Sequence, residues 1–425
     1  MKTLLRNAMI LTMKENEDIF HGEIVIEDGK ITFIGDIARD DNYDSIIECD
    51  NNLIMPGFKN AHAHSAMSFA RSCSDDLSLS SWLNDCIFPM EANIAPEDQY
   101  YLSKVSILEY LTSGITACFD MYYNPMEMLR ASEDIGFRCV LLGTVTKYRE
   151  SVQEMVEAYK TINNPVLHPL VTYRLGYHAE YTCTDEILSE LAKAANELKT
   201  PIFTHLSETE NEVRECIDRH GCTPIEYMER LGLLNYGGGG FHCVHVSDHD
   251  IEIFKKRGLH MVTCPGSNSK LASGIALVDR FIHEGINVAI GTDGAGSNNG
   301  LDFFYEMRLA AVLQKLINKD PSAGQALDYL KAATVGGARA MGLDNCDVLD
   351  IGKCADIIMI DLSRPNMQPI NNISKNIVYS GSKDNIKMTM INGRVLYKDG
   401  KFFINEPIDA IYEKAQEITD RLKSH

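Results

Sequence analysis

Residues 53–64 read LIMPGFKNAHAH and determine how the rest of the chain is interpreted. The stretch begins with a short apolar strand, is interrupted by Pro56 and Gly57, and ends in two histidines one residue apart. Because alternate side chains of a strand point to the same side, the imidazoles of His62 and His64 can be aimed at one point. Two neutral imidazoles in this arrangement are half of a site for a divalent metal. The alternative is a pair of surface-loop histidines, so the remaining ligands have to come from elsewhere in the chain.

Composition describes a soluble globular protein. Of its residues, 45% are hydrophobic and 24% are charged. The length of 425 residues is sufficient for a barrel-sized domain and a smaller one. A net charge of −20 argues against nucleic acid as a partner. We expect neither a signal peptide nor a membrane helix, and hence a cytoplasmic protein. The 12 cysteines include no C-x-x-C pair, which favours reduced thiols over disulfides or a cysteine-ligated zinc.

Both ends of the chain have the pattern of β-structure. Residues 22–36, GEIVIEDGKITFIGD, alternate around a turn and predict a hairpin. Residues 355–361 predict a strand, and residues 386–397 a second hairpin that turns at Asn392 and Gly393. Neither end has enough strands to bury a face alone, so we expect residues 1–54 and 355–406 to share one small β-sandwich. Residues 407–425 are amphipathic and predict a C-terminal helix.

Residues 55–354 alternate apolar, strand-like runs with segments of helical spacing such as 96–112, 183–198 and 248–256. The eight runs lie near Leu53, Ile115, Cys139, Leu170, Pro201, Gly240, His260 and Asn287. Eight such units predict an α/β fold, a (β/α)8 TIM barrel. A doubly wound open sheet is the less favoured alternative, because no G-x-G-x-x-G follows the first strand.

Polar residues that can bind a metal stand where these strands end, which is where barrel enzymes carry their active sites. The first strand ends in His62 and His64, and later ones end in His178, His205, His242 and Asp293. Any one of these histidines could be a structural group. As a set, five of the 13 histidines together with an aspartate favour a metal site.

Four motifs resemble those of a known family. They are P-G-F-x-N-A-H-A-H at 56–64, T-H-L-S-E at 204–208, H-C-V-H at 242–245 and G-T-D-G-A-x-S-N-N at 291–299. They resemble the amidohydrolase superfamily, and within it the adenosine-type aminohydrolases that include the 5′-methylthioadenosine/S-adenosylhomocysteine deaminases. The resemblance covers nearly the whole chain. It implies an enzyme that hydrolytically deaminates a 6-aminopurine nucleoside: adenosine, 5′-deoxyadenosine, 5′-methylthioadenosine and, with less support, S-adenosylhomocysteine.

The resemblance implies that His62, His64, His205 and Asp293 bind the metal and leave one position for water. No lysine at a strand end stands among them, so we expect one divalent metal per chain. Zinc is the first choice, with Fe²⁺ as the alternative because imidazole suits both metals. Zinc lowers the pKa of its bound water to about 7, which makes a hydroxide available to attack C6 of the purine.

The same resemblance assigns the proton transfers. Glu208 is expected to move a proton from the water to a ring nitrogen of the substrate, and so to contact the substrate. His242 and Asp293 are expected to orient or deprotonate the water as catalytic groups, whereas His245 would face the other side of a continuing strand and is left as structural. The alternatives are a first-turn helix residue for Glu208 and a helix N-cap for Asp293.

Further positions concern the substrate. Trp82, the only tryptophan, and Glu91 lie in SSWLNDCIFPMEA, where related enzymes have an apolar wall and a carboxylate that accepts hydrogen bonds from the ribose diol. A helix with a core Trp and a solvated Glu is the alternative. His178 would contact a purine ring nitrogen, and Ser297 would lie near the same ligand.

Two departures from the family pattern bear on the substrate. Glu180 stands where relatives have a proline two residues after the histidine that corresponds to His178. Gly143 stands where an arginine would hold a homocysteine tail, and only Lys147 and Arg149 are near, which weakens the case for S-adenosylhomocysteine. Of these two, Arg149 is the one we expect to contact the substrate.

Two other functions stay open: a free-base aminohydrolase (guanine or pterin) or triazine hydrolase of the same superfamily, and a catalytically silent metal-binding homologue. The family also leads us to expect a homo-oligomer that acts on a small molecule.

Overall fold

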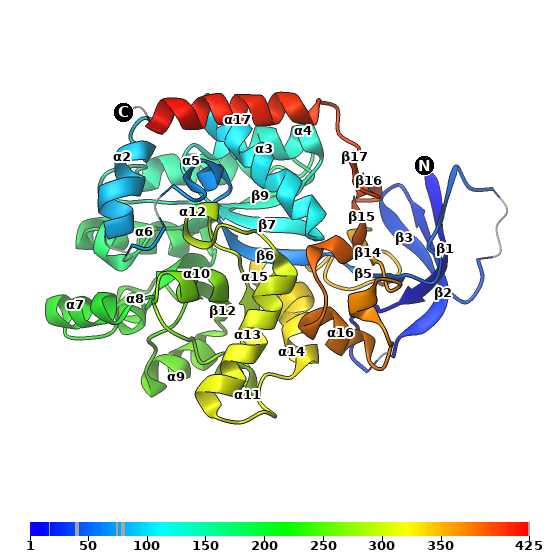
Figure 1. Ribbon diagram of the computed structural model, residues 1–425. Coiled ribbons are helices and arrows are strands. Elements are labelled where there is room, and N and C mark those ends of the chain that lie inside the picture. The colour runs from blue at the N-terminus through cyan, green and yellow to red at the C-terminus, as the bar shows by residue number, and fades with distance from the viewer. Residues whose placement is uncertain (17, 39–41, 74, 78–80, 424–425) are drawn as a thin grey trace.

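Eight parallel strands form a barrel at the centre of the computed structural model, which describes all residues except 17, 39–41, 74, 78–80 and 424–425 (Figure 1). In chain order the barrel strands are β6 (Phe58–Ala63), β7 (Ile115–Met121), β8 (Arg138–Leu142), β9 (Val171–Gly176), β10 (Ile202–Leu206), β11 (Gly238–His242), β12 (His260–Thr263) and β13 (Asn287–Ile290). The backbone N–H of Asp293 donates to His62 O at 3.0 Å and joins the last strand to the first. The predicted (β/α)8 barrel is confirmed.

The strands are apolar on both faces because both faces are covered. Inside the barrel, Phe119, Phe203 and Phe241 pack together with small residues such as Ala61 and Ala289. Outside it lie the helices α3 (Pro96–Thr112), α4 (Pro125–Ile135), α5 (Val152–Ile162), α6 (Asp185–Leu198), α7 (Glu210–His220), α8 (Pro224–Leu231), α9 (Asp248–Arg257), α11 (Val278–His283), α13 (Phe303–Asn318), α14 (Ala326–Lys331) and α15 (Gly337–Met341).

The two ends of the chain build a second sheet beside the barrel (Figure 1). Its strands are β1 (Lys2–Ile10), β2 (Phe20–Glu27), β3 (Lys30–Gly35), β4 (Ser45–Glu48), β5 (Leu53–Pro56), β14 (Ile357–Ile360), β15 (Ile386–Ile391), β16 (Arg394–Lys398) and β17 (Lys401–Phe402). Both predicted hairpins are present. The expected sandwich is one continuous sheet, and side chains from both chain ends, among them Ile26, Ile54 and Met388, share its core. The exact division into domains stays a prediction.

Residues 53–64 cross between the two sheets. The run at Leu53 was predicted to be the first barrel strand, and this is wrong. It forms β5, which pairs with β14, and the first barrel strand begins at Phe58. Gly57 lies at the crossing, where a Cβ would stand 2.1 Å from Thr116 Cγ2, so a side chain there would clash with the second strand. The glycine therefore lets the chain pass closely from one sheet to the other.

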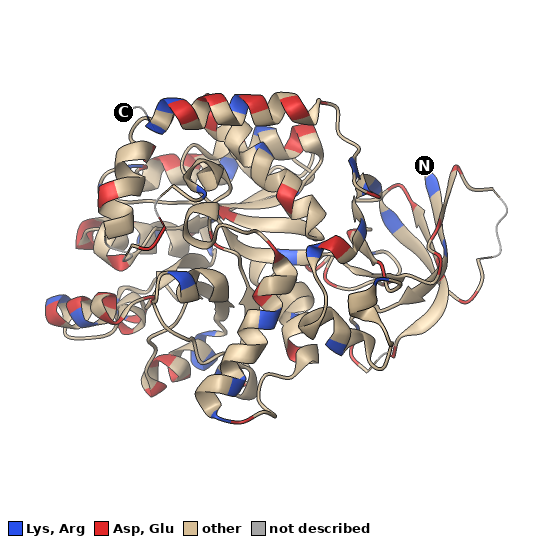
Figure 2. Cartoon of the chain, viewed as in Figure 1, with Lys and Arg blue, Asp and Glu red and all other residues tan. Residues whose placement is uncertain are grey.

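The C-terminal helix α17 (Ile408–Lys423) lies along α3 at the edge of the barrel (Figure 1). Its Ile418 and Leu422 join a buried cluster that contains Trp82, and Arg421 pairs with Asp98 of α3. Acidic and basic residues are interspersed along it (Figure 2). None of the helices in the described part of the chain is both long and apolar enough to cross a bilayer.

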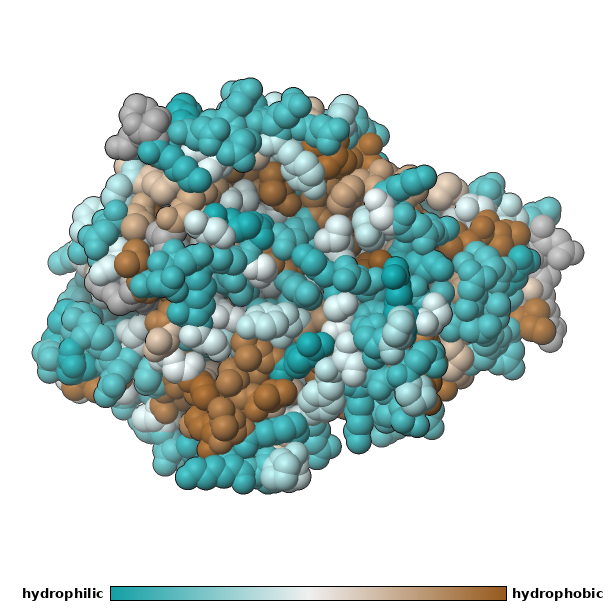
Figure 3. Space-filling model, in the orientation of Figure 1, coloured by the Kyte–Doolittle hydropathy of each residue, from teal (hydrophilic) through white to brown (hydrophobic). Residues whose placement is uncertain are grey.

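Most of the visible surface is hydrophilic, with an apolar area low in the view over the end of α13 (Figure 3). Val312, Leu316 and Ile317 of α13 are exposed. The expected homo-oligomer stays a prediction.

Candidate metal centre and substrate pocket

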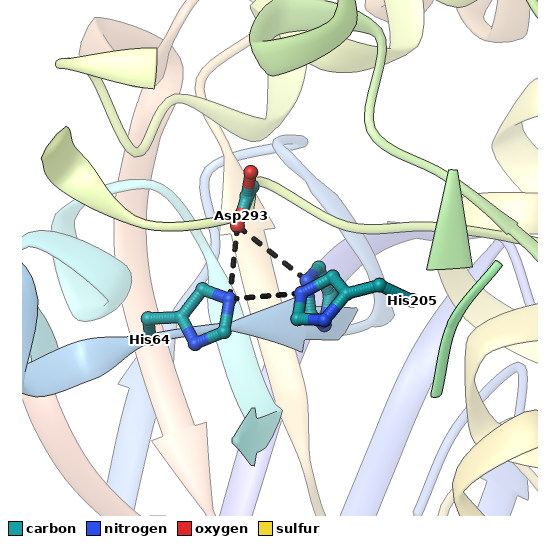
Figure 4. Close-up of side chains that lie close together, drawn as sticks. His64, His205 and Asp293 are labelled. Atoms are coloured by element: carbon teal, nitrogen blue, oxygen red, sulfur yellow. Dashed lines mark hydrogen bonds and ion pairs between the residues drawn. The ribbon is translucent and has the colours of Figure 1, made fainter. Parts of the chain in front are cut away.

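Four side chains from three parts of the barrel meet at its C-terminal end. His62 and His64 come from the end of β6, His205 from β10, and Asp293 from the turn after β13. Their potential ligand atoms all lie within 4.8 Å of one another. Asp293 Oδ1 is 3.2 Å from His64 Nε2, and the Nε2 atoms of His64 and His205 are 3.3 Å apart (Figure 4). Asp293 Oδ1 is also 3.4 Å from His62 Nε2.

Backbone carbonyl groups fix the orientation of two of these rings. His64 Nδ1 donates to Met121 O at 2.6 Å, and His205 Nδ1 donates to His178 O at 2.7 Å. Since a carbonyl oxygen only accepts, the proton lies on Nδ1 and each Nε2 is left with a free lone pair directed to the common point. Such support of the second ring nitrogen is typical of histidines that bind metals.

His62 provides a direct test of whether the set fits a metal. Its side chain is fully buried, and neither ring nitrogen has a hydrogen-bond partner among the described residues. A buried polar atom without a partner is costly, and a cation at the common point would satisfy Nε2. Its ring stacks on Phe241 at a centroid distance of 3.9 Å, which holds it in place. The residues present therefore fit a divalent cation.

The charges of the set also suit a cation. Burial lowers the pKa of His62 to about 3, and it lowers the pKa of His205 well below its usual value with help from neighbouring imidazoles. The pKa of His64 is raised, because Asp293 and the Met121 carbonyl outweigh burial, so a bound cation would replace a proton at His64 Nε2. Burial alone would raise the pKa of Asp293, but His62 and His64 hold it well below its ordinary value. Asp293 Oδ2 accepts from Ser267 Oγ at 2.6 Å and from Ser297 Oγ at 2.8 Å. Neutral imidazoles and one ionised carboxylate are the forms that bind zinc.

Glu208 lies beside this set with its carboxylate in the pocket. It precedes α7, whose N-cap is Thr209 and whose capping carboxylate is Glu212, so it is not the first-turn residue of the alternative interpretation. Its Oε1 accepts from Ser273 Oγ at 3.3 Å, and its Oε2 is 3.8 Å from His242 Nε2. Burial raises the pKa of Glu208 above its usual range.

His242 ends β11 with a left-handed backbone (φ 69°), an unusual conformation for a residue with a side chain. Its Nδ1 lies 2.8 Å from Asn268 Oδ1, which leaves Nε2 toward the pocket. The strand β11 ends at His242, so His245 does not lie on a continuing strand, contrary to the expectation. His245 Nε2 donates to Ser273 O. Asp293 also has a left-handed backbone and is not the N-cap of α12 (Ala295–Asn298), which is Gly294.

The segment after β6 closes one side of the pocket. A π-helical turn, η2 (Trp82–Ile87), runs into α2 (Phe88–Glu91). Trp82 and Glu91 both line the pocket and are each only 5% exposed, so the solvated glutamate of the alternative interpretation is wrong. Glu91 Oε1 accepts from Tyr122 O–H at 2.7 Å, and burial raises the pKa of Glu91 in spite of this bond.

The remaining predicted substrate contacts differ in where the structure places them. His178 lines the pocket beside His205, with a ring-centroid distance of 4.7 Å, and burial lowers its pKa to about 4. Ser297 also lines it, but its hydroxyl is used on Asp293. Arg149 is not among the described residues that line the pocket: its Nη2 donates to Glu91 O at 3.2 Å and its guanidinium lies over Tyr123.

Gly143 does not face the pocket either. A Cβ there would stand 2.4 Å from Met155 Sδ, on the side of the strand that packs against α5. The structure also accounts for the charge at Glu180. Its carboxylate is buried and pairs with Arg219 and His220 at the end of α7, which ties the loop after His178 to the helix after Glu208.

Sequence reasoning missed several residues that support the site: Tyr122, Tyr123, Ser267, Asn268 and Ser273. Tyr122 and Tyr123 follow β7, and Ser267 and Asn268 follow β12 within α10 (Pro265–Lys270). The position of these four hydroxyl and amide side chains shortly after strands is the signal that could have identified them. Ser273 lies beyond α10 and carries no such signal.

Together these features define a metal-binding (β/α)8-barrel protein. The profile of the amidohydrolase family matches residues 53–396, and the chain belongs to this family. A relative from Thermoanaerobacter pseudethanolicus, named 5-methylthioadenosine/S-adenosylhomocysteine deaminase, is 37% identical over 407 residues, or 94% of either chain. A 5′-deoxyadenosine deaminase from Methanothermobacter thermautotrophicus is 37% identical over 394 residues, covering 91% of this chain and 92% of its own.

A solved structure is similar throughout. An adenosine deaminase from Xanthomonas campestris, determined with bound zinc, superposes with a TM-score of 0.94 at 28% identity, over 100% of this chain and 99% of its own. The likeness therefore extends to the second sheet and the C-terminal helix as well as the barrel.

Proposed function

We propose that this protein hydrolytically deaminates a 6-aminopurine nucleoside: water replaces the exocyclic amino group at C6, giving the inosine-type product and ammonia. One observation carries the proposal. A single pocket has the metal-binding set and Glu208 at one end and a second buried carboxylate, Glu91, on the wall formed by η2 and α2. The names of the relatives from Thermoanaerobacter and Methanothermobacter and of the Xanthomonas structure support this class of substrate.

His62, His64, His205 and Asp293 would hold one divalent metal. When bound, the metal supplies Lewis acidity and lowers the pKa of a water to about 7. We propose zinc, because the Xanthomonas deaminase was determined with zinc, with Fe²⁺ as the alternative.

Glu208 is the residue we propose to move the proton. Its carboxylate is buried in the pocket, and its raised pKa brings it nearer to neutral pH, where a carboxylate can both take up and release a proton. A proton delivered to the purine ring nitrogen beside C6 makes that carbon a better electrophile. Asp293 can then take the remaining proton of the added hydroxyl group and pass it to the departing amino group, which leaves as ammonia.

His242 and Asp293 hold the attacking water in our proposal. His242 Nδ1 is fixed on Asn268, so its Nε2 is available to the water. Asp293 is kept ionised by its histidine neighbours and by two serine hydroxyl groups, so it can accept a hydrogen bond or a proton from the water through a free lone pair.

The sugar and purine are placed by residues on the pocket wall. Glu91 offers carboxylate oxygens to the two neighbouring ribose hydroxyl groups, which is a charge-assisted contact. Trp82 provides an apolar surface, and neutral His178 can donate to or accept from a purine nitrogen. Because Arg149 is occupied by Glu91 O and Gly143 faces α5, adenosine, 5′-deoxyadenosine and 5′-methylthioadenosine are better substrates than S-adenosylhomocysteine.

We further propose a cytoplasmic homo-oligomer, in which residues 1–54 and 355–406 form one domain, residues 55–354 the barrel and residues 407–425 a terminal helix. The acidic net charge of −20 fits a small-molecule enzyme without a nucleic acid partner.

A substrate panel tests the proposal. Zinc-loaded enzyme is incubated with adenosine, 5′-deoxyadenosine, 5′-methylthioadenosine, S-adenosylhomocysteine, guanine, a pterin and an aminotriazine, and released ammonia is measured. We expect release from the first three, and less from the homocysteine derivative. Release from guanine, pterin or triazine alone would replace the substrate class, and release from none of the panel would favour a silent metal-binding homologue.

A further inference from the structure

Glu306 is a buried carboxylate that none of the steps above uses. It lies in α13, its side chain is fully buried, and it contributes no atom to the pocket lining among the described residues. Its two oxygens serve different loops: Oε2 accepts from the backbone N–H of Gly266 at 2.9 Å, and Oε1 accepts from Asn298 Nδ2 at 2.8 Å. A buried carboxylate that accepts one donor from each of two loops holds those loops at a fixed separation.

The first of these two segments is the loop after β12, which continues directly into the short helix α10. Gly266 is followed by Ser267, whose hydroxyl donates to Asp293 Oδ2 at 2.6 Å, and by Asn268, whose Oδ1 lies 2.8 Å from His242 Nδ1. The contact with Glu306 therefore anchors the short helix whose next two residues orient Asp293 and His242.

The second segment is the loop after β13, which contains the short helix α12. Asn298 follows Ser297, whose hydroxyl donates to the same Oδ2 of Asp293 at 2.8 Å. Asn298 Nδ2 also donates to Thr292 O at 2.8 Å, next to Asp293 in the chain. Asp293 is therefore positioned by hydrogen bonds from both segments and by one next to it in the backbone. Glu306 contacts Gly266 and Asn298, the neighbours of the two serines that make these bonds.

From this geometry we infer that Glu306 is a positioning residue: through Gly266 and Asn298 it sets the orientation of Asp293 and His242 without touching the substrate. The inference rests on the proposed function, in which those two groups hold the attacking water. One N–H donor points at each of its two oxygens, an arrangement that favours the carboxylate although burial raises the pKa of Glu306 to about 8. A glutamine would offer one acceptor and would place an N–H₂ group against one of the donors.

Gly266 shows how little room the anchor has. A Cβ at this position would stand 2.3 Å from Glu306 Oε1 and 2.5 Å from Asn298 Oδ1. The backbone of α10 therefore lies directly on the carboxylate, and displacement of Glu306 would pass to Ser267 and Asn268.

The test compares Glu306→Gln with Asp279→Asn. Asp279 is a matched control: it is also buried and also accepts from one backbone N–H (Gly324) and one side chain (Tyr329 O–H), each at 2.8 Å. Its partners lie away from the pocket, Gly324 in the loop between α13 and α14 and Tyr329 in α14. For E306Q we expect kcat for 5′-deoxyadenosine to fall about 10- to 100-fold, the range found when residues that support metal ligands are replaced, with KM changed less than about threefold. For D279N we expect a lower Tm and kcat within about twofold of the wild type.

Two further readouts separate positioning from general loss of structure. In the Co²⁺-substituted protein, E306Q should alter the visible absorption bands, which depend on the geometry around the ion, and D279N should not. In a double-mutant cycle, Asn268→Ala combined with E306Q should be no more than about threefold slower than the slower single variant, because both changes interrupt the same chain of contacts from Glu306 through α10 to His242.

The inference is wrong if E306Q loses only Tm, as D279N does, or if the effects of E306Q and N268A on kcat multiply. Should E306Q fail to fold, Asn298→Ala tests the same link from the other loop, with the same expected split between kcat and KM. If the wild type releases no ammonia from any nucleoside, the proposed function fails, and the Co²⁺ spectra of E306Q and D279N still decide the role of Glu306.

Discussion

Replacing Glu91 by Gln separates a nucleoside deaminase from an enzyme that acts on a free base. The Glu91 carboxylate is 5% exposed, lines the pocket and accepts from Tyr122 O–H at 2.7 Å. In our proposal the ribose diol adds hydrogen bonds to the same carboxylate. The change to glutamine removes the negative charge and one acceptor oxygen, while the size and shape of the side chain stay nearly the same.

The expected loss follows from the number and kind of bonds. A hydrogen bond to a charged group contributes about 1.5–3 kcal/mol. Losing one such bond and weakening its neighbour should cost ~2–4 kcal/mol of transition-state binding, or about 30- to 1000-fold in kcat/KM. Burial raises the pKa of Glu91, and only the ionised form makes these bonds, so the advantage of the wild type over the variant should shrink as the pH falls through this raised pKa.

Ammonia release from adenosine and from free adenine, measured side by side, provides the assay. Adenine has no ribose, so its slower turnover should change less than about threefold in Glu91→Gln. Glu97→Gln, an exposed change in the next helix, is the matched control and should leave both substrates unaffected. If E91Q keeps its kcat/KM for adenosine, or loses the same factor with adenine, the proposed ribose contact is refuted.

Three further predictions concern the barrel and its chemistry. Glu208→Gln should retain the metal and lose about 10²- to 10⁴-fold in kcat, measured by metal analysis and ammonia release; unchanged kcat would remove Glu208 from the mechanism. Burial raises the pKa of Glu150 from 4.5 to about 6, so folding favours its protonated form and the wild type loses up to about 2 kcal/mol of stability from this group between these pH values. The free energy of unfolding of Glu150→Gln, measured with urea, should therefore rise relative to that of the wild type as the pH rises from 4.5 to 6. A difference in free energy of unfolding that does not change with pH would contradict this. Asp356→Asn leaves the buried guanidinium of Arg138 unpaired, so it should cost about 3–5 kcal/mol in the same assay; a loss below ~1 kcal/mol would mean that the pair is not buried as described.

The sequence predicts the barrel and the convergence of the metal-binding set for one physical reason. Parallel strands bring their carboxyl ends to the same side, so residues far apart in the chain, such as His64, His205 and Asp293, can be recognised as neighbours from position alone. The two hairpins are predicted for a similarly local reason, since a turn and two alternating runs define them.

What the sequence does not predict depends on contacts between loops. Arg149 and Ser297 lie in the expected segments, but packing turns the first toward Glu91 O and the second onto Asp293. Glu306 belongs to an ordinary helical pattern, and only the folded chain shows that its carboxylate holds two loops. The run at Leu53 was counted with the barrel because an apolar run does not reveal which of two sheets it joins.

The most direct test of the whole proposal is a metal titration of the metal-free protein, followed by ammonia release from 5′-deoxyadenosine. Three imidazoles and one carboxylate form one site, so activity should rise in proportion to added zinc and level off at one ion per chain. Activity that is full without metal, that requires two ions per chain, or that never appears at any zinc ratio would contradict the assignment of His62, His64, His205 and Asp293 as the centre of a nucleoside deaminase.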